Sequence, residues 1–344
     1  MLRDALKKAA AGEALGAGEA ERALEEIMEG TADPAVTAAL LTALRVRGES
    51  VGEVVGFARA MRRFAAKVEA PEDVVDTCGT GGDAKGTINI STAAAFVARG
   101  AGVVIAKHGN RAATSRAGSA DVLEALGAEI GLGPEEVGRC IREVGIGFMF
   151  ARTHHPAMRF VAPVRAELPF RTVFNLLGPL TNPAGAKRQL VGVFHGSYVR
   201  PVAEALRQLG TEKALVVHGR DGLDEITVTG PTFIAEVSNG AVTEYELSPE
   251  RFDLPRHAPD GLLGGDAHLN ARVLRDVLSG EEQGAARDVV LLNAGAAIYI
   301  SGHATTIEEG VRLAEESIAS GAAREALEGF VRATRRLAGV GGVV

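Results

Sequence analysis

The glycine-rich segment at residues 76–83 carries the clearest chemical signal in the chain. It reads Asp-Thr-Cys-Gly-Thr-Gly-Gly-Asp, follows an apolar pair, and places three glycines within four positions before Asp83. Glycine lets the backbone turn with positive φ or approach a ligand closely, and successive N–H groups in such a turn form an anion site. The segment therefore indicates a phosphate-binding loop or a plain tight turn. It matches neither the dinucleotide fingerprint nor the Walker loop.

A basic segment at residues 107–119 follows a second predicted strand. It has four potentially cationic groups within ten residues, in a chain whose formal net charge is −7. Ligands of parallel sheets gather at the carboxyl ends of the strands, so cations there would complement an anion held by the glycines. Solvated loop charge is the alternative for Lys107 and for Arg111, and Ser119 is a candidate helix N-cap.

An acidic segment at residues 218–225 follows a third apolar run. Its adjacent acids Asp224 and Glu225 are hard oxygen ligands of the kind that Mg²⁺ prefers, and an ordinary surface turn is the alternative. We interpret His218 as a structural histidine. Together the glycine-rich, basic and acidic segments suggest a polyphosphate held by backbone amides, cations and Mg²⁺.

The elements that must position these segments alternate between strand and helix from residue 73 onward, which predicts a largely parallel sheet with crossover helices. The predicted strands are 74–75, 103–105, 148–150, 190–194 and 215–217. The predicted helices are 119–126, 134–144, 199–209, 268–279, 286–301, 306–319 and 321–337. Asn239-Gly240 between two further β-type runs, 232–237 and 242–247, predicts a hairpin.

Helical patterns alone fill the first part of the chain, with a capping box at Ser50-Val-Gly-Glu53 and a break at Pro71. The segment 155–187 is helical at first and then rich in Pro, Gly and Asn, so it can complete the N-terminal helices. We predict a small all-helical domain and a large α/β domain with a mainly parallel central sheet and flanking helices. Their predicted residues are 1–70, completed by about 160–188, for the small domain, and 71–159 with 189–344 for the large one.

Composition excludes several classes of protein. The chain has 344 residues, of which 46% are apolar and 24% charged, and its acidic balance argues against nucleic acid as a partner. No apolar run approaches the roughly 20 residues of a membrane span. The two cysteines, Cys78 and Cys140, have no zinc or disulfide spacing, and we interpret Cys78 as a small buried residue rather than a nucleophile. A cytoplasmic location fits best.

Further motifs run along nearly the whole chain. They are Asp76-Thr-Cys-Gly-Thr-Gly-Gly-Asp83, Asn89-Ile-Ser-Thr92, Lys107-His-Gly-Asn-Arg111, Ser119-Ala-Asp-Val-Leu-Glu-Ala-Leu-Gly127, His155-Pro-Ala-Met158, Val164-Arg165, Phe174-Asn-Leu-Leu-Gly-Pro-Leu-Thr-Asn-Pro183, Gly222-Leu-Asp-Glu225 and Asn293-Ala-Gly295. In these motifs the sequence closely resembles the anthranilate phosphoribosyltransferase family. The resemblance implies a nucleoside phosphorylase/phosphoribosyltransferase-like fold and a homodimer joined through the helical domains.

The implied reaction transfers the 5-phosphoribosyl group of phosphoribosyl pyrophosphate (PRPP) to the amine of anthranilate. The products are N-(5-phosphoribosyl)anthranilate and pyrophosphate, in the second step of tryptophan biosynthesis from chorismate. The resemblance also implies which residues contact the substrates: Gly79, Gly82, Asp83, Thr87, Asn89, Ile90, Ser91, Thr92, Lys107, His108, Gly109, Asn110, Arg111, Ala112, Ala113, Thr114, Ser115, Ser119 and Arg165. It implies Mg²⁺, two ions per subunit, held by Ser91, Asp224 and Glu225.

Among these residues, the resemblance gives Arg165 and Asn110 to anthranilate, together with the backbone of Gly79. A guanidinium suits a carboxylate because it can bind both oxygens; without the resemblance, Arg165 would be interpreted as a surface arginine. An aryl amine is neutral and nucleophilic at pH 7, so the difficult step is departure of pyrophosphate, which Mg²⁺ and backbone donors assist. We therefore expect no essential general base, and a polar contact at most for His108.

Two positions depart from the family pattern, which more often has Pro near Arg152 and Gly near Pro169. A pyrimidine nucleoside phosphorylase would share the architecture, but the basic Lys107-His-Gly-Asn run and the Asp224-Glu225 pair argue against it. A noncatalytic relative that binds nucleic acid would need a basic surface and would have lost the glycine loop or the acidic pair.

Overall fold

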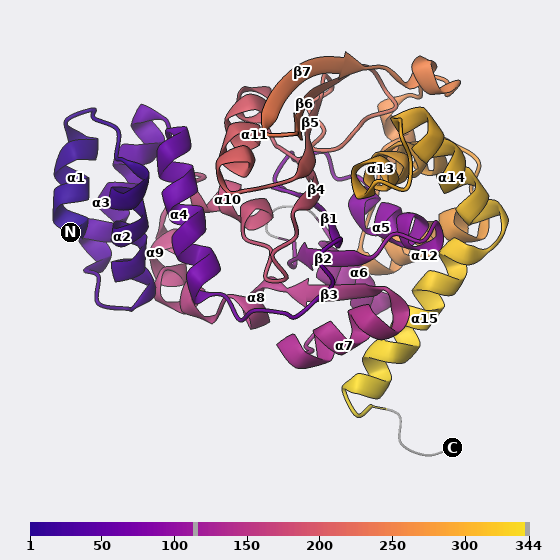
Figure 1. Cartoon of the computed structure of the whole chain (residues 1–344), viewed down its shortest axis with the longest axis horizontal. Helices are drawn as coiled ribbons and strands as arrows, with labels where there is room; N and C mark the ends of the chain where they lie inside the picture. Colours follow the sequence, from indigo (N-terminus) through magenta and orange to yellow (C-terminus); the bar gives the residue numbers. More distant parts are fainter. Residues whose placement is uncertain (113–115, 341–344) are drawn as a thin grey trace.

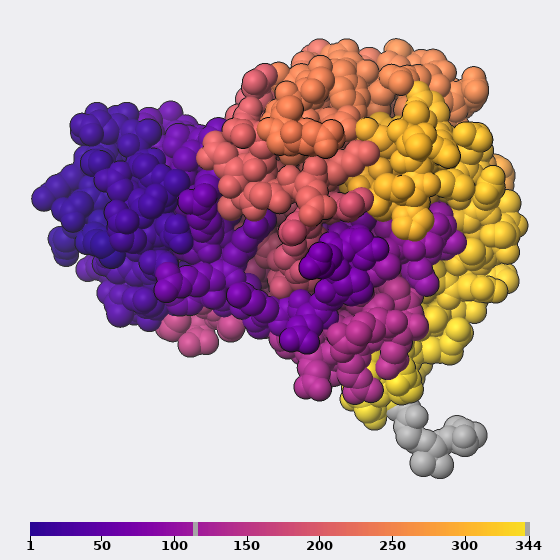
Figure 2. All heavy atoms as spheres, in the orientation of Figure 1, coloured from indigo at the N-terminus to yellow at the C-terminus, as the bar shows by residue number. Residues whose placement is uncertain are grey.

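A central sheet with helices on both faces lies beside a group of N-terminal helices in the computed structural model, which describes residues 1–112 and 116–340 (Figure 1). The N-terminal helices are α1 (Leu2–Ala10), α2 (Ala17–Met28), α3 (Pro34–Arg47) and α4 (Val51–Phe64). We call them the helical lobe (residues 2–64). Figure 2 shows this lobe in indigo as a separate bulge on the larger body.

Local signals explain where these helices begin. The carboxylate of Asp33 accepts the N–H of Ala35 at 2.8 Å, with Pro34 at the first helical position. At α4 the predicted capping box is confirmed, because Ser50 N–H donates to the Glu53 carboxylate at 2.8 Å while Ser50 Oγ accepts the N–H of Glu53.

The seven-stranded sheet has the order β3-β2-β1-β4-β5-β6-β7. Its strands are β1 (Val75–Gly79), β2 (Ile105–Gly109), β3 (Ile146–Phe150), β4 (Arg188–Gly192), β5 (Lys213–Gly219), β6 (Thr232–Ser238) and β7 (Ala241–Leu247). The first five are mutually parallel, whereas β6 and β7 form the predicted antiparallel hairpin. The mainly parallel α/β sheet is thus confirmed. The strand order changes direction between β1 and β4.

Helices cover both faces of the sheet. They are α5 (Ile90–Gly100), α6 (Ser119–Ala125), α7 (Pro134–Val144), α11 (Val199–Gln208), α12 (Ala267–Ser279), α13 (Ala285–Ser301), α14 (Ile307–Ala319) and α15 (Ala322–Leu337). One hydrophobic core joins α5 and α12–α15 to one face. A second core joins α11 on the other face to the helical lobe, so the lobe is anchored to the sheet by shared apolar packing.

The segment from 151 to 180 consists of short helices. They are α8 (Ala151–His154), η1 (Pro156–Phe160), α9 (Ala162–Glu167), α10 (Phe174–Leu177) and η2 (Gly178–Leu180), with η3 (Gly196–Tyr198), η4 (Pro249–Phe252) and η5 (Pro259–Leu262) later in the chain. Helix α9 packs on α3, η1 on α2 and α10 on α4. The domain boundaries stay a prediction, which this packing supports.

Several predicted boundaries were wrong. Strand β1 runs to Gly79 and so includes the first half of the glycine-rich segment, and β4 ends at Gly192 rather than at 194. The second strand begins at Ile105 rather than at 103, because the N–H of Val103 donates back to the carbonyl of Ala98 at the end of α5. Lys107 and His108 therefore lie inside β2 and not in a loop. The N-cap of α6 is Gly118, and Ser119 is its first helical residue. Along residues 1–112 and 116–340, no helix combines the length and the apolar character that a membrane crossing requires.

Candidate active site

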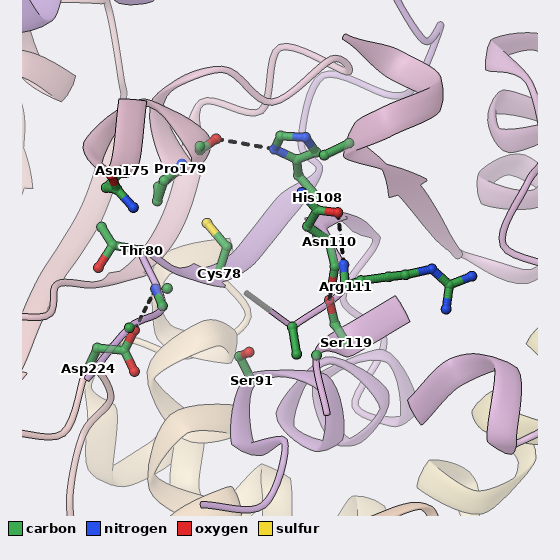
Figure 3. Close-up of a pocket in the computed structure, with 18 of the residues that line it drawn as sticks. Cys78, Thr80, Ser91, His108, Asn110, Arg111, Ser119, Asn175, Pro179 and Asp224 are labelled. Atoms are coloured by element: carbon green, nitrogen blue, oxygen red, sulfur yellow. Dashed lines mark hydrogen bonds between the residues drawn. The ribbon is translucent and has the colours of Figure 1, made fainter. Parts of the chain in front are cut away.

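A cavity of about 570 Å³ lies where β1, β2 and β5 end and α5 begins (Figure 3). In open parallel sheets, ligands bind at the carboxyl ends of the strands where the strand order reverses, and the β1–β4 junction is such a point. The segment of short helices also lines the cavity, with Met158, Arg165 and Phe174 among its lining residues.

The cavity gathers the residues that the sequence predicted. Its lining includes Gly79, Gly82, Asp83, Thr87, Asn89, Ile90, Ser91, Thr92, Lys107, His108, Gly109, Asn110, Arg111, Ala112, Ser119, Arg165, Asp224 and Glu225. Ala113, Thr114 and Ser115 lie outside the described residues. Lining a cavity does not establish contact with substrate, so each assignment remains a prediction.

The glycine loop has the backbone of an anion-binding loop. Gly81 and Gly82 have φ of 66° and 80°, a region that favours glycine. The loop is held at two adjacent residues, because Thr80 N–H donates to the carbonyl of Gly192 at 2.8 Å and Gly81 N–H donates to Asp224 at 2.8 Å. The Gly81 amide thus already holds a carboxylate oxygen in the described structure. A phosphate oxygen of a substrate is, like a carboxylate oxygen, a negatively charged hydrogen-bond acceptor, so it suits the same kind of backbone donor.

The two adjacent acids are buried together, with 9% of Asp224 and 8% of Glu225 exposed. Burial, and then the neighbouring Asp83, raises the pKa of Asp224 to about 7. Burial, and then Asp224, raises the pKa of Glu225 to about 8, against a lowering by the backbone N–H of Ser91. Within the described chain, no set of three or more His, Cys, Asp or Glu forms a preformed metal cage. A pair of crowded buried carboxylates nevertheless fits Mg²⁺, which takes one or two protein carboxylates and fills its shell with water and phosphate oxygens.

A buried hydrogen-bond network holds the acidic loop in place. Asn293 on α13 accepts from Ile226 N–H at 3.1 Å and donates to the carbonyl of Ile226 at 2.8 Å. Asp221 accepts from Thr227 Oγ1 at 2.7 Å. These three bonds are made by residues just before and just after the acid pair, so the family motif at Asn293 acquires a physical role: it fixes the peptide that follows Glu225.

Position 192 on β4 has to be glycine, because the backbone of the acidic loop lies very close to it. An added Cβ would lie 1.5 Å from the carbonyl oxygen of Asp224. We expect Gly192→Ala to lower the free energy of unfolding by about 1–3 kcal/mol, measured by urea denaturation, and to weaken Mg²⁺ activation because the acids are displaced. Gly329→Ala on α15, where a Cβ would meet nothing within 4 Å, is the control and should keep wild-type stability or exceed it. Wild-type stability and wild-type Mg²⁺ activation in Gly192→Ala would contradict the prediction that the acidic loop requires glycine at position 192.

Lys107 is not a solvated charge, because only 4% of it is exposed. Its ammonium donates to the carbonyl of Thr77 and to Ser91 Oγ, the latter at 3.3 Å. Burial lowers the pKa of Lys107, and nearby Asp76 opposes that effect. Asp76 in turn accepts from the backbone of His108 at 3.0 Å and from Asn182 at 2.8 Å. Lys107 therefore brings positive charge to the start of α5 from within the sheet.

Arg111 lies at the cavity edge, but its guanidinium points toward α6 (Figure 3). It pairs with Asp121 and with Glu124, each at 2.8 Å. Ser119 Oγ donates to the carbonyl of Asn110 at 3.3 Å. These side chains brace the basic segment, and a substrate contact by Arg111 stays a prediction.

Arg165 on α9 lines the same cavity as the acids. Its guanidinium stacks on the ring of Phe174, 5.2 Å from the centroid. Burial lowers the pKa of Arg165, yet a guanidinium stays charged at pH 7. Among residues 1–112 and 116–340 no carboxylate pairs with it. A cation without a partner at a cavity is suited to an anionic ligand.

His108 has a defined tautomer. Its Nδ1 lies 3.1 Å from the carbonyl of Gly178, which can only accept, so Nδ1 carries the proton. Nε2 is then an acceptor, and it has no partner among the described residues. Burial, and then neighbouring His155, lowers the pKa of His108 to about 3. The imidazole is neutral at physiological pH and too weakly basic for efficient proton abstraction.

Sequence reasoning missed Arg171, which lies between the glycine loop and Phe194. It donates to the carbonyl of Gly82 and stacks 4.3 Å from the centroid of Phe194. Its neighbour Asn175 lines the cavity as well, although it lies within a quoted motif. No spacing along the chain marks Arg171 as a site residue, and only the fold brings this arginine to the glycines.

The remaining polar candidates are structural. Cys78 is 7% exposed, and burial raises the pKa of its thiol well above the usual range. His218 contacts the carbonyl of Val193 at 2.7 Å and is not among the cavity-lining residues. Both interpretations agree with those made from the sequence.

Comparison with known families first identifies the class of protein. The helical bundle domain of a glycosyl transferase family matches residues 3–65, and the α/β domain of a glycosyl transferase family matches residues 71–324. The matched ranges correspond to the helical lobe and to the part that contains the sheet. Fold and cavity together therefore define a two-domain glycosyl transferase.

Individual relatives identify the family within this class of glycosyl transferases. Anthranilate phosphoribosyltransferase of Rubrobacter xylanophilus is 82% identical over 341 residues, 99% of this chain and 100% of that protein. The crystal structure of the Thermus thermophilus enzyme is 50% identical with a TM-score of 0.92, covering 96% of this chain and 99% of that one. The Saccharomyces cerevisiae enzyme has been solved with PRPP and Mg (30% identity, TM-score 0.89) and with 4-fluoroanthranilate (29%, 0.88), each covering 97% of this chain and 98% of that one. The chain belongs to the anthranilate phosphoribosyltransferase family.

Proposed function

We propose that this cavity transfers the 5-phosphoribosyl group of PRPP to the amine of anthranilate, releasing pyrophosphate, as the second step of tryptophan biosynthesis from chorismate. One observation carries the proposal: a single cavity is lined by the glycine loop, the buried acid pair and the unpaired cation Arg165. PRPP has phosphates that suit the glycine loop and a metal held by the acids, and anthranilate has a carboxylate that suits Arg165. The yeast relative, solved with PRPP and Mg and with 4-fluoroanthranilate, supports both assignments.

On the donor side, the proposal assigns the phosphates to backbone amides and to the start of α5. The amides of the glycine loop and the helix N-terminus both favour anions. Lys107 supplies a buried positive charge at this point. Ser91, Asp224 and Glu225 would hold Mg²⁺, two ions per subunit. When bound, Mg²⁺ supplies charge stabilisation for the departing pyrophosphate.

On the acceptor side, the residues of the chain orient the amine. Arg165 binds the carboxylate of anthranilate, and the neutral Nε2 of His108 accepts a hydrogen bond from the amine. Holding the amine near the ribose C1 carbon supplies the proximity that a bimolecular reaction lacks. The positively charged amine formed on attack loses its proton readily, so no strong base is needed.

A pH profile tests the role of His108. Because burial lowers the pKa of His108 to about 3, this group does not titrate between pH 6 and 8. At saturating Mg²⁺ we expect the profiles of kcat for wild type and for His108→Asn to be parallel in this range, with turnover lowered by about tenfold or less. Steady-state assays at several pH values measure this. An inflection near pH 6.5 that disappears in His108→Asn would identify His108 as a general base and contradict the proposal.

The activity itself is tested by the loss of anthranilate fluorescence. Loss should require both PRPP and Mg²⁺, and the nucleotide-like product should accumulate in equal amount. Absence of loss under every condition would refute the proposed reaction.

We also propose a cytoplasmic homodimer joined through the helical domain, taken as residues 1–70 completed by about 160–188. An apolar side chain on α3, Val46, is 82% exposed, which suits an interface. The two cysteines are buried and unpaired, which suits a reducing compartment. Sedimentation equilibrium of wild type and Val46→Glu tests the dimer, since the charged variant should dissociate more readily.

A further inference from the structure

Asn270 on α12 is a buried polar side chain outside every motif that identified the family. It is 2% exposed and lies one helical turn after the N-cap Asp266. It contacts two elements far apart in the sequence: the backbone of Gly265 and the side chain of Asn89. Asn89 is the N-cap residue of α5 and lines the cavity. Asn270 therefore connects the cavity to a helix that does not line it.

The direction of this connection is determined by the backbone groups at its two ends. Gly265 N–H can only donate, and it lies 2.8 Å from Asn270 Oδ1. The Nδ2 of Asn270 then donates to Asn89 Oδ1 at 2.8 Å. The Nδ2 of Asn89 in turn donates to the carbonyl of Ala117 at 3.2 Å, and that carbonyl can only accept. Neither amide can be reversed without placing like atoms together at both of its contacts.

This arrangement changes how α5 begins. An N-cap asparagine ordinarily uses its side-chain oxygen to accept an N–H of its own first turn. Among the described residues Asn89 makes no such cap, because Asn270 uses that oxygen. The start of α5 is thereby left without its own side-chain cap, and the N–H of Ser91 faces Glu225. The N–H groups of Ile90, Thr92 and Ala93 donate to backbone carbonyls instead, so the contribution of Asn270 is to fix the Asn89 side chain at this helix start.

The loop before Asn270 packs closely against the residues that lead into α5. Ile88 N–H donates to the carbonyl of Leu262 at 3.0 Å, and Gly264 N–H donates to the carbonyl of Gly86 at 2.8 Å. A Cβ at Gly264 would lie 2.6 Å from Asn270 Oδ1 and 2.7 Å from the carbonyl oxygen of Thr87. The segment 262–265 thus runs against the strand-like stretch that leads into α5, and it has no space for a larger residue.

We infer that Asn270 is a positioning residue for the pentosyl donor: it orients the Asn89 amide at the start of α5 and, through Asn89, joins α5 to the end of the basic segment at Ala117. The inference rests on the proposed function, in which Asn89 contacts PRPP. Asn270 itself touches no substrate and acts only through Asn89.

The test measures KM for each substrate in three variants. Asn270→Ala removes both contacts, and isosteric Asn270→Asp keeps an acceptor for Gly265 but cannot donate to Asn89. Each should raise the KM for PRPP by about tenfold, the scale of one hydrogen bond, while the KM for anthranilate changes by less than about twofold. Asn89→Ala should raise the KM for PRPP at least as much.

The double variant distinguishes positioning from a general structural effect. If Asn270 acts through Asn89, then Asn270→Ala or Asn270→Asp added to Asn89→Ala should change the KM for PRPP by less than about a further twofold. Ser317→Ala is the matched control, because Ser317 donates a buried hydrogen bond to α5 at Val97, away from the cavity, at 2.8 Å. It should lower thermal stability as much as Asn270→Asp without affecting either KM.

The possible results distinguish a wrong role for Asn270 from a wrong proposed function. An unchanged KM for PRPP in Asn89→Ala would show that Asn89 is not a donor contact, so the proposed donor site would be wrong at this position. A raised KM in Asn89→Ala with a wild-type KM in Asn270→Asp would overturn the inference alone. Additive effects in the double variant, or an equal rise in the KM for anthranilate, would overturn it as well.

Discussion

The combined change Asp224→Asn and Glu225→Gln should lower turnover at limiting Mg²⁺ by about 10²- to 10³-fold, the loss seen when a group that stabilises developing charge is removed. The physical reason lies in the geometry of the acid pair. Both carboxylates are buried against Asp83, so they gain most from a divalent cation. The amides that replace them have the same shape and carry no charge. Initial rates over a Mg²⁺ titration measure the effect.

A matched control separates this effect from simple loss of acidity. Glu246 on β7 pairs with Arg220, and 43% of its side chain is exposed. Glu246→Gln should therefore leave both the turnover and the Mg²⁺ dependence unchanged. High Mg²⁺ should recover part of the activity of the double variant. Near-normal turnover of the double variant at limiting Mg²⁺ would remove the acid pair from the metal site.

Arg165→Ala should raise the KM for anthranilate by about 10- to 100-fold, since a hydrogen bond to a charged group contributes about 1.5–3 kcal/mol. The KM for PRPP should change by about threefold or less, because the variant leaves unchanged the glycine loop, Lys107 and the acid pair, which we assign to PRPP and its Mg²⁺. The absence of a carboxylate partner for Arg165 in the described chain means that truncation removes a substrate contact without exposing an unpaired acid. Steady-state kinetics with each substrate varied in turn provides both constants.

Arg159 supplies the comparison for this experiment. It stacks on Phe160 at 4.5 Å from the ring centroid, as Arg165 stacks on Phe174, but it does not line the cavity. Arg159→Ala should therefore leave both KM values unchanged. Equal increases in the KM of anthranilate and of PRPP for Arg165→Ala would show a general disturbance of the cavity and not a carboxylate contact.

Local chemistry made part of the fold predictable. The β6–β7 hairpin follows from Asn239-Gly240, whose φ values of 50° and 74° belong to the left-handed region that such turns need. The glycine loop was predictable for a related reason, since two of its residues have positive φ. In both cases one or two residues specify the backbone, so sequence alone is sufficient.

Burial of polar side chains was not predictable in this way. Periodicity places a strand on the apolar run 103–105, whereas the strand lies at Ile105–Gly109 and includes Lys107 and His108. These side chains are buried because Thr77, Ser91 and Gly178 supply partners from other elements. A pattern along one strand contains no information about such partners.

The basic segment shows a second kind of tertiary contact that its spacing does not contain. The guanidinium of Arg111 binds two acids of α6, which begins at Ser119, and its substrate contact stays a prediction. Arg171 was overlooked, although the fold brings it to Gly82. Spacing in the sequence thus located the site to within a loop, and tertiary contacts decided which side chains of each loop point into it.

The cavity is lined by residues from two parts of the protein, and this has a consequence for evolution. Arg165 belongs to a helix packed on the helical lobe, whereas Asp224 follows a strand of the sheet. Ala66 N–H donates to the carbonyl of His154 at 2.8 Å, close to where the two parts join. A chimera that combines the helical lobe of one relative with the sheet domain of another would keep both recognition surfaces intact and could still fail as a catalyst. The fit between the two parts would then matter for rate as much as the residues that either part contributes.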